Sequence, residues 1–255
     1  MQLVDTHTHL YLPEFDSDRD EMVSRATVNG IEKLLMPNID IHSVEAMLSA
    51  ADRYEGICFP MLGLHPTSVK EDYIMQLDKL EKIFTEYKFI AVGEIGIDLY
   101  WDKTHLKEQL EVMRRQVELA IRSDLPVVVH SRESFPEVFS VLDEFAGAGL
   151  KGVLHAFSGT MNDAEKAVEM RFMLGIGGPL TYKNSKLDII VKETGIENVI
   201  LETDSPYLAP VPYRGQRNES SYIRIINKKM ADIFGMSEEE SARITYENSC
   251  RLFKI

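Results

Sequence analysis

Cysteine, long apolar runs and positive charge are all scarce in this chain of 255 residues. Its two cysteines, Cys58 and Cys250, lie far apart and match no zinc or redox spacing, which predicts buried thiols in a reducing cytoplasm. No stretch approaches the run of about 20 apolar residues that a membrane-spanning helix needs. No basic segment followed by an apolar one resembles a secretory signal. We therefore expect a cytoplasmic protein with no membrane partner.

The balance of charge disfavours one class of nucleic-acid binder. Lys and Arg together number 28, against 41 for Asp and Glu, which gives a formal net charge of −13 at pH 7. Broad, non-specific adhesion to nucleic acid depends on many contacts between cations and phosphates, and this chain is poorly suited to it. An enzyme that holds one phosphate with metal ions and a few local cations is still compatible with this charge.

Short apolar runs alternate with longer amphipathic stretches along the whole chain. The runs predict eight strands, at Leu3–Thr6, Lys33–Pro37, Ile57–Leu64, Phe89–Glu94, Pro126–His130, Gly152–His155, Phe172–Gly177 and Asn198–Glu202. The stretches predict helices at Asp18–Asn29, Ile41–Tyr54, Gln76–Tyr87, Thr104–Ser123, Phe135–Phe145, Met161–Met170, Lys186–Thr194, Tyr222–Phe234 and Ser237–Leu252. Strict alternation is typical of parallel strands covered by helices, and eight repeats favour an α/β protein of the (β/α)8 TIM-barrel type. No linker divides the chain, so we predict a single domain over residues 1–255.

Histidines and carboxylates gather at the C-terminal ends of the predicted strands. His7 and His9 follow the first strand, where positions i and i+2 project from the same face. The other residues at such ends are His65, Glu94, His130, His155, Glu202 and Asp204. Because a barrel enzyme carries its chemistry at that rim, we expect these side chains to converge there. His42 and His105 lie near predicted helix starts and are interpreted as ordinary surface residues.

A rim with so many titratable groups predicts bound cations, because the unpaired groups would be costly to bring together. Imidazole and carboxylate ligands suit Zn, Mn or Mg, with Mg the least comfortable on imidazole. We predict two ions that share Glu94, one held by His7, His9, Glu94 and Asp204 and the other by Glu94, His130 and His155. Glu202 stays open as a ligand or as a residue behind the ligands.

Short motifs carry these residues from one end of the chain to the other. They are D-T-H-T-H at 5–9, G-L-H-P at 63–66, V-G-E-I-G-I-D at 92–98, P-V-V-V-H-S-R at 126–132, L-H-A-F-S-G at 154–159, L-E-T-D-S-P-Y-L at 201–208 and R-G-Q-R-N-E at 214–219. In this order they resemble the motifs of the TatD-type metal-dependent deoxyribonucleases, within the amidohydrolase-like barrels. Two mild departures touch no ligand: the segment 99–102 follows a motif after which family members vary, and Ser134 stands where a small residue such as Ala is usual.

The resemblance implies a (β/α)8 fold and hydrolysis of DNA phosphodiester bonds by a 3′–5′ exodeoxyribonuclease, in which a metal-activated water attacks phosphorus. It implies two divalent ions (Mg, Mn or Zn) on His7, His9, Glu94, His130, His155 and Asp204. The expected catalytic residues are Asp204 as proton acceptor, Glu94 as the group that fixes the metal spacing, and His130, or else His65, as proton donor to the leaving oxygen. The expected substrate contacts are His65, Arg132, Arg214 and Arg217.

Other functions stay open at this point. The same scaffold hydrolyses amide, ester or lactone bonds of small molecules in other enzymes, and a non-catalytic metal-binding protein would share the ligand set. The loop residue Trp101 is open between stacking on a base and packing within its loop. DNA is the expected partner as substrate, and no obligate protein partner is evident from the sequence.

Overall fold

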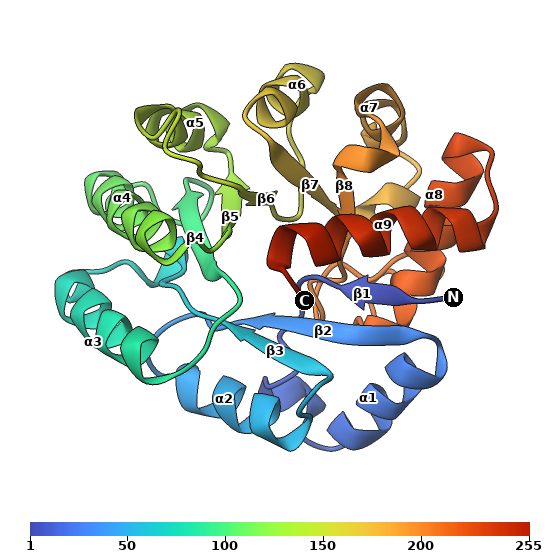
Figure 1. Ribbon diagram of the computed structural model, residues 1–255, viewed down its shortest axis with the longest axis horizontal. Helices are drawn as coiled ribbons and strands as arrows, with labels where there is room; N and C mark the ends of the chain where they lie inside the picture. Colours follow the sequence, from blue (N-terminus) through green and yellow to red (C-terminus); the bar gives the residue numbers. More distant parts are fainter.

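The computed structural model describes residues 1–255, and its strands and helices alternate as predicted (Figure 1). The strands are β1 (Leu3–Asp5), β2 (Ile31–Pro37), β3 (Cys58–Met61), β4 (Val92–Asp98), β5 (Val127–Arg132), β6 (Gly152–Leu154), β7 (Phe172–Ile176) and β8 (Val199–Leu201). The helices are α1 (Arg19–Val28), α2 (Val44–Arg53), α3 (Tyr73–Glu86), α4 (Leu106–Ser123), α5 (Phe135–Glu144), α6 (Met161–Glu169), α7 (Leu187–Thr194), α8 (Ile223–Phe234) and α9 (Glu238–Phe253). None of these helices is both long enough and apolar enough to cross a membrane.

The eight strands close into a barrel. Neighbouring strands pair in parallel in two ladders, β1-β2-β3 and β4-β5-β6-β7-β8. Two isolated bridges join the ladders: Thr8 pairs with Ser205 just after β8, and Leu62 pairs with Val92 at the start of β4. At the second seam the amide of Gly93 also donates to the carbonyl of Leu62, at 3.0 Å. The prediction of an α/β protein with a (β/α)8 TIM barrel is therefore confirmed.

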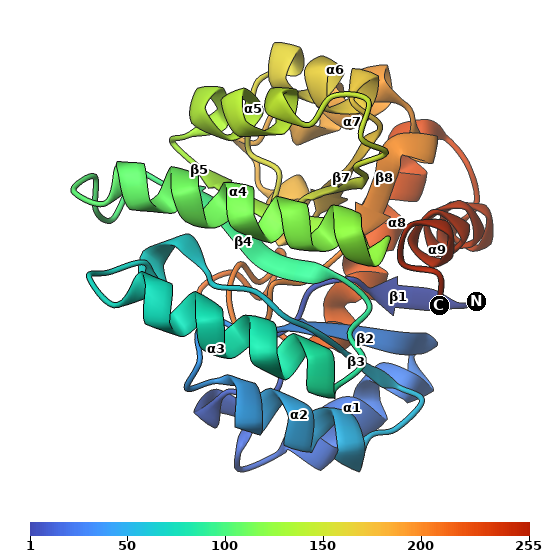
Figure 2. The same cartoon turned by 60° about the vertical axis from the view of Figure 1, so that its left-hand side comes forward.

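The helices pack their apolar faces against the outside of this barrel. A continuous cluster of 52 buried hydrophobic residues joins the two layers. Helix α4 contributes Val112, Met113, Val117 and Ala120, which lie on one face at helical spacing. Figure 2 shows α4 lying along β4 with α3 beside it. Burial of each large aliphatic side chain contributes about 1.5–3 kcal/mol, so this layer gives the strands a rigid support.

A second buried cluster marks the opposite end of the barrel from the site. It takes one side chain from each strand except β4, which Ala91 directly precedes, together with Leu252 and Phe253 at the end of α9. The strand-side residues are Val4, Leu35, Met61, Ala91, Val128, Val153, Met173 and Ile200. Helix α9 contacts β1 and β8 and lies close to the N-terminus (Figure 1). This end of the barrel is filled with apolar atoms, so polar chemistry is confined to the other end.

One strand differs from the prediction in a way that affects the site. Strand β4 runs on to Asp98, so Glu94 is its third residue and does not end the strand as predicted. The register of β4 against β5 shifts between Gly93 and Ile95. A Cβ atom on Gly93 would lie 2.6 Å from Cβ of Val128, and one on Gly96 would lie 2.0 Å from the carbonyl oxygen of His130. The two glycines therefore allow β4 to bulge while staying close to β5, so the predicted strand end at Glu94 is wrong.

Candidate metal centre

Hydrogen bonds between the segment after β1 and the segment after β8 bring three of the predicted ligands together: His7, His9 and Asp204. The carbonyl oxygen of His7 accepts a hydrogen bond from the amide of Asp204 at 2.9 Å, and the amide of His9 donates to the carbonyl of Ser205 at 2.8 Å. Asp204 adopts a left-handed φ of 58°, which aspartate tolerates better than most residues. Two segments almost 200 positions apart are thus held in register with their side chains on one rim.

Glu94 lies at the centre of the site, and its two carboxylate oxygens face different histidines. Oε2 is 3.2 Å from Nε2 of His7 and 4.0 Å from Nε2 of His9. Oε1 is 3.0 Å from Nδ1 of His130, with His65 and His155 at 3.4 and 3.7 Å. One carboxylate thus faces two groups of histidines, as a shared ligand would. The prediction placed His155 with His130, whereas the ligand atoms of His155 group with those of His7 and Asp204.

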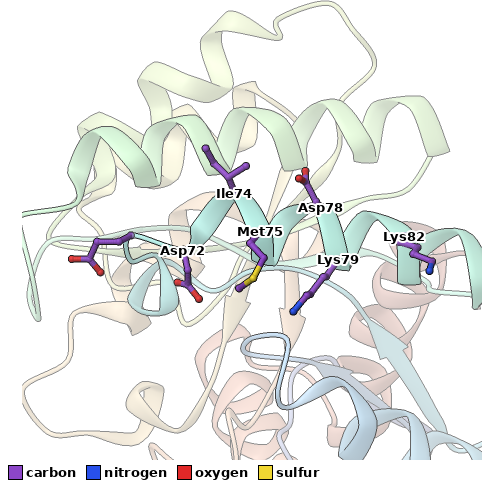
Figure 3. Close-up of a pocket in the computed structure, with 7 residues that line it drawn as sticks. Asp72, Ile74, Met75, Asp78, Lys79 and Lys82 are labelled. Atoms are coloured by element: carbon purple, nitrogen blue, oxygen red, sulfur yellow. The ribbon is translucent and has the colours of Figure 1, made fainter.

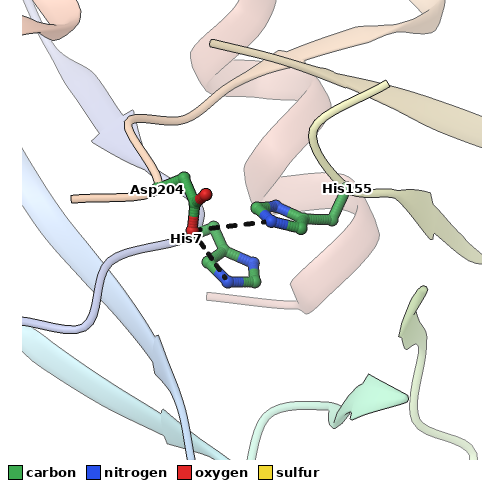
Figure 4. A group of neighbouring side chains, drawn as sticks. All are labelled: His7, His155 and Asp204. Carbon is green, nitrogen blue, oxygen red and sulfur yellow. Dashed lines mark ion pairs between the residues drawn. The ribbon is translucent and has the colours of Figure 1, made fainter. Parts of the chain in front are cut away.

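The carboxylate of Asp204 lies beside three of the histidines. Its Oδ1 lies 3.8 Å from Nε2 of His7 and 3.6 Å from Nε2 of His155, as Figure 4 shows. His9 is equally near, with Nε2 at 3.6 Å from the same oxygen. The rings of His7 and His155 stack with their centroids 3.4 Å apart. Several nitrogen and oxygen atoms therefore converge on the space in front of Asp204.

Residues behind the ligands orient the imidazoles of His9 and His130. Nδ1 of His9 lies 3.1 Å from the hydroxyl of Tyr11, which itself donates to the carbonyl of Pro37, so the hydroxyl accepts from His9. Nε2 of His130 donates to Oδ2 of Asp98 at 2.9 Å, because a carboxylate can only accept. Each of these contacts places a hydrogen on the outer nitrogen and leaves the inner nitrogen free to bind a cation.

Glu202 plays the same part behind His155. Its Oε1 lies 3.0 Å from Nδ1 of His155 and also accepts from the amide of Ala156 at 2.5 Å. Its side chain is buried and belongs to none of the three groups of side chains in this structure that could hold a metal ion. The geometry therefore favours the second of the two alternatives left open for Glu202, a residue behind the ligands.

His65 differs from the other histidines in the position of its hydrogen. Its Nδ1 accepts a hydrogen bond from the backbone N–H of Thr67 at 3.2 Å. A backbone N–H only donates, so the neutral ring carries its hydrogen on Nε2, which faces Oε1 of Glu94. This hydrogen can be donated to an oxygen of a substrate, which is the role expected of His65.

Burial and mutual attraction set the charges of these groups. Burial disfavours the charged form of His155, but attraction to Glu202 and Glu94 outweighs it and raises the pKa to about 10. Burial is likewise outweighed at His130, where hydrogen bonds to Asp98 and Glu94 raise the pKa to about 8. Burial and the nearby charge of His155 lower the pKa of His7 to about 4.

Both carboxylates of the site are ionised at neutral pH. Burial raises the pKa of Glu94, but attraction to His65, His155 and His7 outweighs it and brings the pKa well below its usual value. Burial of Asp204 is outweighed by a hydrogen bond from His9 and by the charges of His155 and His7, which lower its pKa. The raised pKa values of His155 and His130 thus favour positive charge next to the buried carboxylates, where bound metal ions would supply it instead.

Divalent cations fit this donor set. The side chains form three overlapping groups in which the ligand atoms lie within 4.8 Å of one another: His7, His155 and Asp204; His7, His9 and Glu94; and His65, Glu94 and His130. The buried Nδ1 atom of His7 has no hydrogen-bond partner, and that of His155 has only the contact with Glu202 at 3.0 Å. Mixed imidazole and carboxylate ligands suit Zn or Mn, and metal binding would replace protons that the histidines now carry.

The site opens into a cavity of about 940 Å3 at the mouth of the barrel. All of the expected ligands except His7 line it, and the other lining residues include Trp101, Phe157, Leu187 and Tyr207. Arg132 and Lys186 are its two basic residues, and neither forms an ion pair with a carboxylate of the protein. The cavity is therefore a mainly apolar space with an acidic, histidine-rich floor and unpaired positive charge on its wall.

The two arginines of the loop after β8 do not line this cavity. The guanidinium of Arg217 donates to both carboxylate oxygens of Asp18, at 2.6 and 2.7 Å, and lies over the ring of Phe15. Arg214 lies over the ring of Tyr182 at 4.5 Å. The structure thus brings Arg132 to the site as expected and holds Arg217 away from it, because Asp18 satisfies its charge.

A second hollow lies on the outer face of α3 (Figure 3). It is lined by Asp72, Ile74, Met75, Asp78, Lys79 and Lys82, among others. It shares no residue with the cavity at the barrel mouth and includes no member of the three potential metal-binding groups. The chemistry of this protein is therefore assigned to the barrel mouth.

Sequence reasoning missed two residues of the site. Asp98 and Tyr11 were given no role, although each orients a histidine. Asp98 ends the V-G-E-I-G-I-D motif, and its spacing of four from Glu94 places both residues on one face of a strand that continues past Glu94. Tyr11 follows His9 at i+2, but nothing in the sequence distinguishes it from other tyrosines.

Comparison with known proteins places this barrel in a family. The sequence model of TatD related DNase matches residues 4–254. The uncharacterized metal-dependent hydrolase YabD of Bacillus subtilis (strain 168) is 34% identical over 254 residues, which cover 99% of this chain and 99% of that protein. Human deoxyribonuclease TATDN3 is 33% identical over 263 residues, covering 98% of this chain and 94% of that protein.

Solved structures agree with these relatives. The crystal structure of YjjV, a TatD homologue from Escherichia coli K12, has a TM-score of 0.93 and 28% identity, and covers 99% of this chain and 98% of that chain. An uncharacterized amidohydrolase from Saccharomyces cerevisiae has a TM-score of 0.85 at 16% identity and covers 99% and 100%, which shows the shared fold alone. The protein is a metal-dependent hydrolase with an amidohydrolase-like TIM barrel, and it belongs to the TatD related DNase family.

Proposed function

We propose that this chain hydrolyses phosphodiester bonds of DNA and removes nucleotides from the 3′ end. The observation that carries the proposal is Arg132, a guanidinium with no carboxylate partner on the wall of the cavity above the ligands. In an acidic protein, an unpaired arginine beside a metal centre is suited to an anionic substrate, and a guanidinium binds phosphate through two parallel hydrogen bonds. The family description and the name of human TATDN3 support the same chemistry.

The proposed metal ligands are those expected from the sequence: His7, His9, Glu94, His130, His155 and Asp204. Glu94 would reach both of two ions, since its oxygens face different histidines. Two divalent ions there would supply Lewis-acid polarisation of a phosphodiester oxygen and lower the pKa of a nearby water. Asp98, Tyr11 and Glu202 keep the imidazoles in the orientation that binding needs.

The protein's own groups would handle the protons. Asp204 is ionised at neutral pH because its pKa is lowered, so its carboxylate can accept the proton of an attacking water. His65 carries a hydrogen on Nε2 and can donate it to an oxygen of the substrate. Of the two histidines expected to protonate the leaving oxygen, His65 is favoured, because His130 uses one nitrogen for Asp98 and offers the other as a ligand.

The test is hydrolysis of single- and double-stranded DNA labelled at the 3′ or the 5′ end, with Mg²⁺ or Mn²⁺ present and product sizes followed over time. We expect early release of the 3′ label and a ladder that shortens from that end. Early release of the 5′ label would contradict the direction. Hydrolysis of an amide or lactone panel, with intact DNA, would contradict the substrate and favour the small-molecule alternative.

A matched pair of variants tests the observation behind the proposal. Loss of a charge-assisted contact costs about 1.5–3 kcal/mol, so Arg132→Met should lower kcat/KM on DNA by about 10- to 100-fold. Arg243→Met removes a surface arginine that pairs only with Glu247 and should leave the rate unchanged. Metal content should be equal in both. An Arg132→Met rate equal to the parent's would remove the main argument for a phosphate substrate.

A further inference from the structure

We propose that Trp101, with Tyr100 and Arg132, forms a subsite that stacks on one nucleobase of the substrate beside the metal centre. This inference rests on the proposed function and adds a part of the substrate that the metal chemistry does not require. Trp101 is the only tryptophan of the chain and lines the same cavity as the ligands. Trp101 is nevertheless 69% exposed, and its neighbour Tyr100 is 50% exposed.

The rings of Trp101 and Tyr100 are in contact and nearly perpendicular to each other. They meet edge to face, with centroids 5.0 Å apart and an interplanar angle of 86°. A flat ring left open to water at the wall of an apolar cavity gains both from loss of hydration and from π-stacking when another flat ring covers it. Stacking on tryptophan or tyrosine is the usual way in which proteins bind unpaired bases without reading their sequence.

The loop that carries these rings is held in place before any substrate binds. Oδ1 of the buried Asp98 accepts the backbone N–H groups of both Tyr100 and Trp101, each at 3.0 Å. Further along, Oδ1 of Asp102 accepts the amide of Thr104 at 2.8 Å. A loop fixed in this way loses little conformational freedom on binding, which favours a role in recognition.

Arg132 places positive charge against the same surface. Its guanidinium lies 3.8 Å from the ring centroid of Tyr100 and 5.4 Å from that of Trp101. The chain offers it no carboxylate, so its N–H groups are available to an anion at the edge of the aromatic surface. A flat apolar ring next to an unpaired guanidinium matches a nucleotide, in which a base lies a short distance from a phosphate.

Asp98 also connects this surface to the metal centre. Its Oδ1 holds the aromatic loop, while its Oδ2 accepts from Nε2 of His130 at 2.9 Å. Arg132 follows His130 by two residues on β5. The base subsite and a metal ligand are therefore fixed by one buried carboxylate and one strand, so a bound base would be held in register with the scissile phosphate.

The single tryptophan allows a direct test by its fluorescence. The probes are a thymidine tetranucleotide and an abasic deoxyribose phosphate oligomer of the same length, which share backbone charge and differ in the bases. The titration uses the Asp204→Asn variant, in which the proposed hydrolysis is blocked. We expect the thymidine probe to quench Trp101 and to bind about 10-fold more tightly than the abasic probe. Equal affinity of the two probes, without quenching, would overturn the subsite.

Two substitutions of Trp101 complete the test, with affinities measured by calorimetry. Trp101→Ala should remove the preference for the base-bearing probe, while Trp101→Phe should keep most of it, and binding of the abasic probe should be the same in both. Metal content reports on folding. A Trp101→Ala variant that still prefers the thymidine probe by the same factor would refute the subsite.

These experiments distinguish a failure of the base subsite from a failure of the proposed nuclease function. Base-dependent quenching in a protein that does not cleave DNA would support the subsite and contradict the nuclease. DNA cleavage with kcat/KM unchanged in Trp101→Ala would support the nuclease and contradict the subsite.

Discussion

Glu94 is the residue on which the metal centre depends most, because each of its carboxylate oxygens faces a different set of histidines. Glu202 contacts only His155 and the amide of Ala156. We predict that Glu94→Ala lowers activity more than Glu202→Ala does. Loss of a partner behind a ligand costs about 10- to 100-fold in metal affinity or activity, whereas loss of a shared ligand disturbs both ion positions and costs more.

Elemental analysis and hydrolysis rates at saturating metal check this difference. Glu94→Ala should lose bound metal and should not recover when more is added, while Glu202→Ala should recover in part. Equal metal content and equal rates in the two variants would argue against a bridging Glu94.

Asp98 has a different role, since it acts through His130. Asp98→Asn replaces the charged acceptor opposite Nε2 of His130, which contributes to the raised pKa of about 8. We predict that this variant lowers the pKa of His130 and weakens metal binding by about 10- to 100-fold. Proton NMR of the imidazole, in the protein with metal removed, measures the first effect, and calorimetry measures the second.

Asp102→Asn is the matched control for Asp98→Asn. Asp102 belongs to the same loop, where it accepts from Thr104 and pairs with Lys70, but it contacts no histidine of the site. The pKa of His130 should be unchanged in that variant. An equal loss of metal affinity in both variants would show that the loop as a whole, and not the Asp98 contact with His130, supports the site.

At the scale of elements, the alternation of strands and helices was predictable because each strand is a short apolar run and each helix an amphipathic one. The course of β4 was not predictable, because Gly93 and Gly96 interrupt the apolar run and are typical of a strand end. Their actual role depends on how closely β5 approaches, which is a property of two segments together. The role of Asp98 was not predictable for the same reason, because its partner His130 lies on β5.

The side chains of the rim were largely predictable from their positions, because parallel strands of one barrel end at one face. The prediction for His7, His9, His155 and Asp204 needed only that rule, and the structure brings these four together with Glu94, which lies within β4 and not at its end. Which arginines reach substrate could not be predicted, since a loop position does not reveal an ion-pair partner. The phosphate contacts expected of Arg214 and Arg217 stay predictions, and Arg217 has a partner in Asp18.

The loop after β8 is held to α1 by that ion pair. Arg217 holds the pKa of Asp18 to about 2 through its hydrogen bonds, with a further contribution from Arg25. An acid whose pKa is lowered by folding stabilises the protein above its usual pKa of 3.8 and stops doing so as the pH falls towards 2. We predict that Arg217→Ala lowers the free energy of unfolding by about 1 kcal/mol at pH 7 and by less below pH 4.

Urea denaturation at several pH values measures this effect, and hydrogen exchange of residues 206–218 locates it. Arg214→Ala serves as the control, because Arg214 contacts the ring of Tyr182 and no carboxylate. Its effect on stability should not depend on pH between 3 and 7. A similar pH dependence in both variants would mean that Asp18 is not the group that titrates.

The whole molecule separates stability from chemistry along the barrel axis. One end is filled by apolar side chains and covered by α9, and the other collects the buried histidines and carboxylates. Those carboxylates add to the net charge of −13, so the site attracts cations before it can accept an anionic substrate. Metal binding should therefore precede substrate binding and should also stabilise the fold, because the loops of the rim are joined through the ligands.

The histidines of the metal centre lead to a prediction of how the stability of the protein depends on pH. With metal removed, His155 and His130 have raised pKa values of about 10 and 8, so they stabilise the fold below their usual pKa of 6.5 and lose this effect as the pH rises through 8 and then 10. Metal competes with the same protons, so its affinity should increase as the pH rises from 6 to 8. His7, with a pKa of about 4, does not compete in this range.

Thermal unfolding with and without a chelator, at pH 6, 7 and 8, tests the opposed trends. A free ion at 100 times its Kd stabilises the fold by about 2.7 kcal/mol, which corresponds to roughly 5–10 °C in Tm. The difference between the metal-bound and chelated protein should widen from pH 6 to pH 8, and calorimetry in buffers of different ionisation enthalpy should show protons released on binding. His42→Ala, which alters an exposed histidine away from the site, should behave as the parent. A difference in Tm that stays constant with pH, with no proton release, would mean that the ion does not displace the protons of His155 and His130 and would remove both residues from the ligand set.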